Sequence, residues 1–401
     1  MKKHIGILFP PRSGGGVFQF TLSVANGLLA YAPDKFQYSI IYYEGESKPE
    51  VSSKENVNYI LLPNRCRSSI RKAIHFLGLV TGLDFLVIKD LDKALQNKNI
   101  DLLVISTPFS FDVPFKIPYV ACLPDYMHKY YPRWPEYTWM TKTTRDIIYP
   151  YYARHSLLTV ADSAQGADDI HTFTRVPMTK IRTIYYVAPS YTYKHKNMTD
   201  SESSKLLEKY GLPKKFIYYP AQFWPQKYHD HLLRALHKIK EAHGVEIPLV
   251  VVGSNKGNHA RYFKQVMDLA ENLGIKNLII HPGYVEDIEA VALYKKAVAL
   301  VSPAFQGPTT LPPLEAMVLG TPVVTANIFE VPKQVGGAAL LFNPSNIDDI
   351  AQKVYKVWTD EKLRGEMREK GYAQTKNLTL SNYGEKWTRV IEEALQHHES
   401  R

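Results

Sequence analysis

Short apolar runs alternate with amphipathic stretches along almost the whole chain. Each run is continuous rather than alternating, which is typical of parallel strands that are buried on both faces. Because segments of helical period separate the runs, we expect parallel α/β layers. The expected strands are Ile5–Phe9, Tyr38–Tyr43, Leu102–Ser106, Tyr119–Leu123, Leu157–Ala161, Ile181–Tyr186, the run that starts at Phe216, Leu249–Val252, Leu278–His281, Val298–Ser302 and Thr321–Thr325.

A polar, charged segment interrupts this pattern near the middle of the chain. Residues 191–204 have no apolar periodicity, so we interpret them as a linker. The sequence therefore predicts an N-terminal domain at 1–190 and a C-terminal domain at 205–380. Helices are expected near Val17–Tyr31, after the first strand, and near Tyr383–His397, within a last segment at 381–401.

Composition and cysteine use agree with a globular protein in a reducing compartment. The chain has 401 residues, of which 45% are hydrophobic and 22% charged, enough for two cores. Cys66 and Cys122 are far apart and have no metal-ligand spacing, which argues against a disulfide framework. No signal peptide precedes the first strand and no run is long enough to cross a bilayer, so we expect a cytoplasmic location.

The formal net charge of +10 could indicate binding to nucleic acid, to an anionic membrane surface or to anionic substrates. Arg65, Arg67, Arg71 and Lys72 precede the apolar segment 73–88. This segment could be an interfacial helix at the inner face of an anionic membrane, or a buried helix with a solvated basic start, which we favour. Zinc-finger spacing and RNA-binding aromatic signatures are absent, so we do not expect nucleic acid as a partner.

Residues 307–324 combine a loop, a helix start and a strand. Gly307 and Pro308 break the preceding run, and Thr309 and Thr310 can cap a helix. The first turn of such a helix points free N–H groups beyond the strand ends, where a phosphate can bind. Glu315 would lie in that first turn and could bind ribose hydroxyls, or it could only complement the helix dipole.

Three further segments carry candidate chemistry. The first is Phe216–Leu233, where an apolar strand leads into a loop with Lys227 and His229. The second is the loop Arg12–Gly16, whose glycines let a substrate approach the backbone but lack the spacing of a P-loop or a dinucleotide fingerprint. The third is Pro124–Trp139, an aromatic segment that either stacks on sugars or packs between helices.

These motifs together resemble glycosyltransferase family 4, a retaining family with the GT-B fold. That resemblance implies two Rossmann-like doubly wound domains that face a cleft, with the last helix crossing back to the first domain. The family pattern brackets the donor sugar with two Glu residues that are separated by seven positions. Glu315 matches the second of them, whereas Gly307 stands at the first, as in a family subgroup that has Gly-Pro-Thr here.

The resemblance also assigns roles to single residues. Lys227 matches the lysine of the diphosphate clamp, while Gln222 replaces its arginine. Asp125 matches the Asp of a His-Asp pair whose His is replaced by Pro124. The implied catalytic residues are Lys227 and Asp125, and the implied acceptor-binding residues are Gly14, Gly15, Gly16, Tyr126 and His128. The implied donor-binding residues are Gln222, Lys227, His229, Gly253, Tyr284, Gly307, Pro308, Thr309, Thr310, Leu311 and Glu315.

The resemblance further implies an enzyme that moves a hexose from a nucleoside-diphosphate sugar to a hydroxyl of a glycan or lipid-linked glycan, with retention and without a metal or cofactor. Two alternatives remain open. A non-catalytic sugar-nucleotide-binding scaffold subunit would explain why Gly307, Gln222 and Pro124 replace usual functional residues. A sugar-nucleotide epimerase on the same fold would isomerise the donor without an acceptor. The nucleotide base, the sugar and the acceptor are not readable from the sequence.

Overall fold

The chain folds into two compact units. A computed structural model describes residues 2–10, 15–52, 56–63, 74, 77, 90–107, 116–134, 136–305 and 307–400. The first unit consists of residues 1–132, 137–190 and 378–401, and the second of residues 133–136 and 191–377. The unit boundary at 190 coincides with the end of the expected N-terminal domain.

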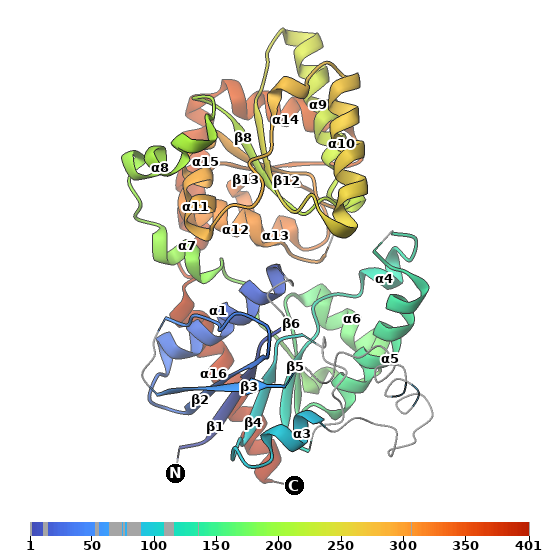
Figure 1. The fold of residues 1–401 in the computed structure, drawn as a ribbon, viewed down its shortest axis with the longest axis vertical. Coiled ribbons are helices and arrows are strands. Elements are labelled where there is room, and N and C mark those ends of the chain that lie inside the picture. The colour runs from blue at the N-terminus through green and yellow to red at the C-terminus, as the bar shows by residue number, and fades with distance from the viewer. Residues whose placement is uncertain are drawn as a thin grey trace. The chain divides into compact units, whose positions relative to one another are not determined.

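The first unit is built on a parallel sheet that has seven strands within the described residues. Their order is β3-β2-β1-β4-β5-β6-β7, and helices cover both faces (Figure 1). Every residue of the central strands β1, β4, β5 and β6 is buried, as their continuous apolar runs predict. The strands are β1 (His4–Leu8), β2 (Gln37–Tyr43), β3 (Val57–Leu62), β4 (Leu102–Ile105), β5 (Tyr119–Cys122), β6 (Leu158–Ala161) and β7 (Ile181–Thr183).

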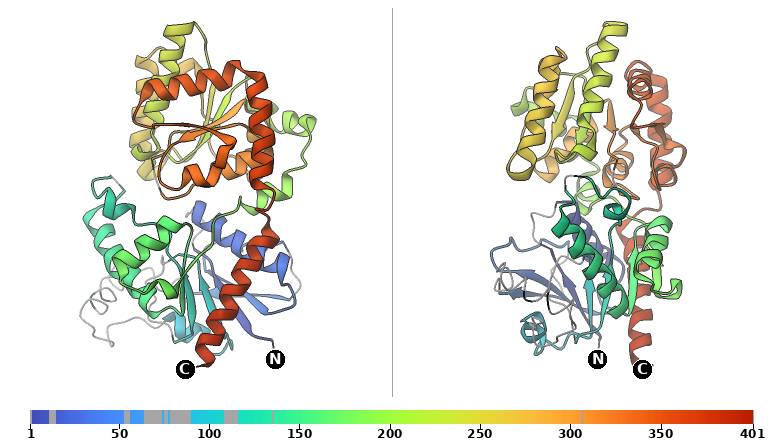
Figure 2. Two further views of the ribbon diagram at one scale, coloured as in Figure 1. Left: turned by 180° about the vertical axis from the view of Figure 1, so that it is seen from behind. Right: turned by 90° about the vertical axis from the view of Figure 1, so that its right-hand side faces the viewer.

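The last helix of the chain packs against the first helix of this unit. The helices are α1 (Gly16–Tyr31), α3 (Asp90–Leu95), α4 (Met127–Tyr130), α5 (Trp139–His155), α6 (Ala164–Thr174), the 3-10 helix η4 (Met178–Lys180) and α16 (Leu380–Glu399). Helix α16 lies along α1, and Gly27 meets Gly384 where their backbones touch (Figures 1 and 2). Trp387, which is fully buried, fills the same contact beside Phe20.

The second unit repeats the same architecture with six strands among the described residues. Their order is β10-β9-β8-β11-β12-β13 and all pairs are parallel. The strands are β8 (Ile217–Pro220), β9 (Leu249–Val252), β10 (Ile279–Ile280), β11 (Ala299–Ser302), β12 (Val323–Ala326) and β13 (Ala339–Phe342). The α-helices are α7 (Ser190–His195), α8 (Asp200–Leu207), α9 (His229–His243), α10 (Ala260–Asn272), α11 (Asp287–Lys296), α12 (Leu311–Leu319), α13 (Val331–Val335), α14 (Ile347–Thr359) and α15 (Glu361–Thr375). The 3-10 helices are η5 (Glu208–Tyr210), η6 (Pro225–Lys227), η7 (Gly257–His259), η8 (Lys276–Leu278) and η9 (Gly336–Ala338).

The predicted linker at 191–204 was wrong. This segment forms α7 and most of α8, and it belongs to the second unit. Thr199 and Glu202 make a complete capping box at the start of α8, with the Thr199 side chain accepting from the Glu202 N–H. Helix α8 then packs one face against α11. The polar sequence is therefore helical because its N-terminus is capped and because α11 covers one of its faces.

Two details of the predicted helix after Gly307 also need correction. Thr310 is the N-cap residue of α12, but its side chain accepts no capping hydrogen bond. Glu315 does not lie in the first turn, because the helix begins at Leu311. The helix ends at Gly320, which has the left-handed backbone conformation (φ 77°) that favours glycine at this position.

Several sequence predictions fall outside the described residues. They are Arg12, Ser13 and Gly14, the basic residues Arg65, Arg67, Arg71 and Lys72, and all of the apolar segment 73–88 except residues 74 and 77. In the part of the chain that the structure describes, no helix has both the length and the apolar character needed to cross a membrane.

Candidate active site

The strand order of the second sheet reverses between β8 and β11. The chain proceeds outward from β8 through β9 to β10 on one side, and from β11 through β12 to β13 on the other. In doubly wound sheets, ligands bind beyond the carboxyl ends of the two strands where the order reverses. The loop after β8 contains Lys227 and the loop after β11 contains Gly307. Both loops identified in the sequence therefore lie at this point.

The loop after β8 is fixed by contacts of its backbone. The Tyr219 hydroxyl donates to the Lys227 carbonyl oxygen over 2.8 Å, which ties the loop to the strand. Lys227 is half-buried and Gln222 is exposed. The loop therefore carries one ammonium group and one neutral amide, which together have less positive charge than two cations would have.

His229, the first residue of α9, lies in an aromatic cluster next to this loop. Its ring is 2% exposed and stacks on Phe223 with 4.5 Å between centroids. Burial, together with the nearby Lys227 charge, lowers the pKa of His229 to about 3, so the ring is neutral at physiological pH. The Ala221 backbone opposes this shift, yet neither ring nitrogen has a hydrogen-bond partner of normal geometry among the described residues.

The loops after neighbouring strands are joined to one another. The Phe305 N–H, after β11, donates to the Gln226 carbonyl oxygen in the β8 loop over 2.8 Å. Gly253, after β9, lies so close to this loop that a Cβ atom there would come within 2.3 Å of the Ala221 oxygen. The Gly253 carbonyl is in turn 2.9 Å from the His281 ring at the end of β10. The loops after β8, β9 and β11 and the end of β10 are thus joined along one edge of the sheet.

The loop Gly307–Thr310 is held from the side of α13. The Gln334 amide bonds Thr310 twice: its Oε1 accepts from the Thr310 N–H over 3.1 Å and its Nε2 donates to the Thr310 carbonyl over 2.8 Å. The Glu330 N–H donates to the Pro308 carbonyl over 3.1 Å. Because the Thr310 N–H donates to Gln334, it is not free to bind a phosphate while this hydrogen bond is present.

Glu315 is a buried carboxylate with a specific partner. Its side chain is 6% exposed, and its Oε2 accepts from the Tyr191 hydroxyl in α7 over 2.8 Å. Burial raises the pKa of Glu315 to about 7, against the opposing effect of the Tyr191 and Tyr294 hydroxyls. The Tyr294 hydroxyl lowers the pKa of Glu315, although it makes no hydrogen bond of normal geometry. The donor role of Glu315 stays a prediction, and the structure adds Tyr191 to its surroundings.

The raised pKa of Glu315 predicts a pH-dependent stability difference. The pKa of Glu315 is higher in the folded protein than in the unfolded chain. Its protonated form therefore contributes stability that is fully present below about pH 4.5 and is lost as the pH rises through about 7. Glu315→Gln removes this titration. We therefore expect the variant to gain stability relative to the wild type by up to about 3 kcal/mol between pH ~4.5 and ~7.5. Melting temperatures over this range test it, with the exposed Glu246→Gln as the control, and a difference that does not change with pH would contradict it.

Asp125 lies in the first unit, between β5 and α4. Its Oδ1 accepts from the Met127 N–H over 2.9 Å and lies 3.3 Å from the Arg145 guanidinium. Arg145 also lies over the rings of Tyr137 and Tyr149, at 5.1 and 5.7 Å from their centroids. The Met127 N–H and the Arg145 guanidinium both contact the same oxygen of Asp125, whose side chain is 19% exposed. Asp125 is thus held in place while part of it faces solvent.

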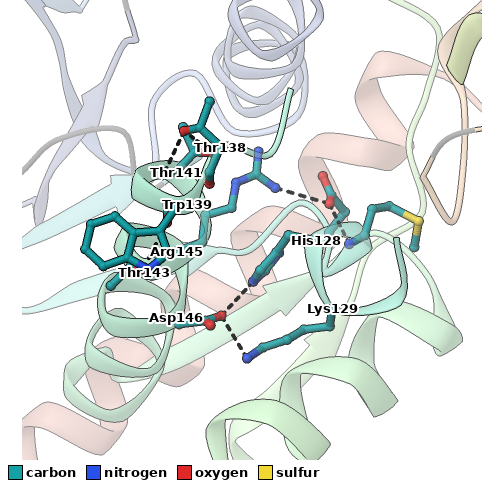
Figure 3. Close-up of polar contacts among 10 residues, drawn as sticks. His128, Lys129, Thr138, Trp139, Thr141, Thr143, Arg145 and Asp146 are labelled. Atoms are coloured by element: carbon teal, nitrogen blue, oxygen red, sulfur yellow. Dashed lines mark hydrogen bonds and ion pairs between the residues drawn. The ribbon is translucent and has the colours of Figure 1, made fainter. Parts of the chain in front are cut away.

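His128, in α4, belongs to a second cluster of polar side chains, which lies between α4 and α5. Its Nε2 is 2.9 Å from Asp146 Oδ1, and the Lys129 ammonium binds the same oxygen over 2.8 Å. Figure 3 shows His128 and Lys129 converging on Asp146, with Arg145 pointing away from it. Burial, reinforced by Arg145, lowers the pKa of His128. A neutral His128 then donates from Nε2 to the carboxylate.

The aromatic segment is buried at Tyr126, His128 and Tyr137, while most of its other described residues are half-buried or exposed. Tyr126 and His128 are each 2% exposed, and Tyr126 contacts the ring of Phe173 at 5.2 Å. Trp139, at the start of α5, is 78% exposed. The burial of Tyr126 and His128 fits the packing alternative that the sequence left open, whereas Trp139 is not packed between helices. Contact of Tyr126 and His128 with an acceptor stays a prediction, which this packing does not favour.

The remaining candidates take ordinary structural positions. Gly15 is the N-cap of α1 with φ 52°, a conformation that favours glycine, and Gly16 starts the helix. Tyr284 is 77% exposed after β10. Sequence reasoning missed Gln226, Gln334 and Tyr191, because nothing in their local sequence shows the distant partners that they contact.

Comparison with protein families and curated proteins points to sugar transfer. Residues 203–374 match the family model of glycosyl transferases group 1. The serotype-specific mannosyltransferase WbdA of Escherichia coli is 28% identical over 196 residues, which cover 48% of this chain and 24% of that protein. The O-antigen chain mannosyltransferase B of Escherichia coli is 30% identical over 183 residues, covering 45% of this chain and 47% of that protein. The chain thus spans half or less of the length of these relatives.

Solved structures resemble the chain over nearly its full length. A glycosyltransferase from Rickettsia africae has a TM-score of 0.71 at 18% identity, covering 98% of this chain and 99% of that one. Anabaena HepE in complex with UDP and glucose has a TM-score of 0.73 at 17% identity, covering 97% and 99%. At such identities these likenesses establish the fold alone. The chain has the two-domain GT-B fold, and its residues 203–374 match the family model of group 1 glycosyltransferases.

Proposed function

We propose that this protein is a retaining, metal-independent glycosyltransferase that moves a hexose from a nucleoside-diphosphate sugar to a hydroxyl of a glycan or lipid-linked glycan. The observation that carries this proposal is the meeting of the Lys227 and Gly307 loops where the strand order of the second sheet reverses. Both loops lie within the residues that match the family. The mannosyltransferase names of the relatives make mannose the first sugar to test.

Catalysis in this proposal comes from positioning and charge. The acceptor hydroxyl attacks as the sugar–phosphate bond loosens, and its proton passes to the departing diphosphate. Lys227 stabilises the negative charge that develops on the leaving group. His229, being neutral, adds no charge there and can only donate or accept a hydrogen bond.

Glu315 and Asp125 would each bind a hydroxyl group of a substrate. A ribose hydroxyl would give the Glu315 carboxylate a further donor beside Tyr191 and favour its ionised form. Asp125, steadied by Arg145 and the Met127 N–H, would orient a sugar hydroxyl through its other oxygen. Acceptor contacts at Gly15 and Gly16, and peripheral contact with an anionic membrane, are further parts of the proposal.

Product analysis tests this function. The purified protein is incubated with UDP- and GDP-hexoses, with and without glycan acceptors, and the product's anomeric configuration is determined by NMR. Acceptor-dependent transfer with retention is the expected result. Isomerised donor without an acceptor would replace the proposal with an epimerase, and donor binding without any conversion would replace it with a scaffold subunit.

A further inference from the structure

The side chain of Gln226 has no hydrogen-bond partner although it is buried. It is 1% exposed, and neither its Oε1 nor its Nε2 is paired with any group in the described part of the chain. Buried side-chain amides in native proteins are nearly always paired, so an exception needs an explanation. An apolar side chain of the same shape would fill this space without that cost. The amide therefore points to a partner that the ligand-free protein lacks.

Gln226 occupies a central place in the candidate donor site. It is the middle residue of η6, directly before Lys227, and its backbone carbonyl receives the Phe305 N–H from the loop after β11. The backbone on either side is fixed, because the Lys227 N–H donates to Trp224 and the Tyr228 N–H donates to Pro225. Rotation about its side-chain bonds can thus turn the amide toward a ligand while the loop stays in place.

The chemistry of the amide selects the group that it can bind. A glutamine side chain both donates and accepts hydrogen bonds, and both of its ends lack partners here. Phosphate oxygens accept only, so they would leave Oε1 unpaired, whereas a sugar hydroxyl donates and accepts. We propose that Gln226 binds a hydroxyl group of the transferred sugar, a role that rests on the donor site proposed above. Lys227 then binds the diphosphate and Gln226 selects the sugar.

The experiment separates the sugar from the nucleotide. Dissociation constants of UDP, UDP-glucose, GDP and GDP-mannose are measured by calorimetry for the wild type, Gln226→Met and Lys227→Ala. Methionine keeps the length of the side chain and removes both polar ends. Gln352→Met, on the exposed side of α14, is the matched control.

The expected result is a split between the two variants. Gln226→Met binds the nucleoside diphosphate as the wild type does, but binds the preferred sugar nucleotide about tenfold more weakly. Lys227→Ala loses affinity for both, and Gln352→Met changes neither. The ligand-free melting temperature of Gln226→Met stays equal to that of the wild type or rises.

Other outcomes overturn the assignment. Equal loss for nucleoside diphosphate and sugar nucleotide in Gln226→Met would move the amide to the diphosphate or ribose. Unchanged sugar-nucleotide binding would leave it no ligand role. If neither Gln226→Met nor Gln226→Leu folds, the amide is needed in the ligand-free protein. Absence of any nucleotide binding by the wild type would instead remove the proposed function and this role with it.

Discussion

Lys227→Ala is expected to reduce turnover by about 10²–10³-fold, the usual effect of removing one group that stabilises developing charge. Lys227 lies where the second sheet's strand order reverses, and Gln222, its neighbour in the loop, carries no charge to replace it. The fold should survive the substitution, because the Tyr219 hydroxyl binds the Lys227 backbone carbonyl rather than its side chain.

Initial rates of sugar transfer measure this effect, with the melting temperature as a check on folding. Lys264→Ala is the matched control, since Lys264 lies on the exposed surface of α10 in the same unit and forms an ion pair with Asp268 on the same helix. Near-native turnover in Lys227→Ala would show that the leaving group is stabilised elsewhere.

Gly384→Ala is expected to have the largest effect on stability. A Cβ atom at this position of α16 would lie only 1.8 Å from the Gly27 oxygen of α1, a backbone atom that cannot turn aside. The two helices must therefore separate, at a cost of about 3 kcal/mol or more in the free energy of unfolding. The higher helix propensity of alanine returns only about 1 kcal/mol.

Gly365→Ala is the control, because it makes the same substitution in a helix where no other backbone lies close to the glycine. Gly365 lies inside α15, and a Cβ atom there meets nothing within 4 Å. Its stability should be unchanged or rise by about 1 kcal/mol. Thermal or denaturant unfolding of both variants measures the difference. Equal stability of the two would mean that α1 and α16 do not approach each other this closely.

The central strands of both sheets could be predicted from the sequence, but two edge strands could not. Runs such as Leu102–Ile105 and Leu249–Val252 are apolar throughout because helices cover both of their faces. The strands that the sequence analysis missed, β3 and β13, each end a sheet and have mostly half-exposed residues. A strand at the edge of a sheet is less buried and can carry polar side chains, so the apolar run that identifies a strand in the sequence is weaker there.

The helices at 190–207 were missed for a different reason. Their sequence is polar, and only Ser203 and Leu207 of α8 are buried. The capping box of Thr199 and Glu202 was present in the sequence and could have indicated the start of α8. Local capping, rather than apolar periodicity, was the informative pattern here.

The candidate site was predictable where its residues act through local motifs. Lys227 and Gly307 follow strands directly, and parallel strands bring their carboxyl ends to one edge. Tyr191 and Gln334 were not predictable, because their hydrogen bonds reach Glu315 and Thr310 across 124 and 24 positions. The unpaired amide of Gln226 is likewise a property of packing, which no local pattern records.

The most direct test of the central claim is whether the Lys227 loop binds a nucleoside diphosphate. Melting temperatures of the wild type, Lys227→Ala and Lys264→Ala are measured with UDP and with GDP. At about 100 times its dissociation constant, the correct nucleotide should stabilise the wild type and the control by ~2.7 kcal/mol, and Lys227→Ala far less. No stabilisation by either nucleotide, or equal stabilisation of all three proteins, would contradict the account.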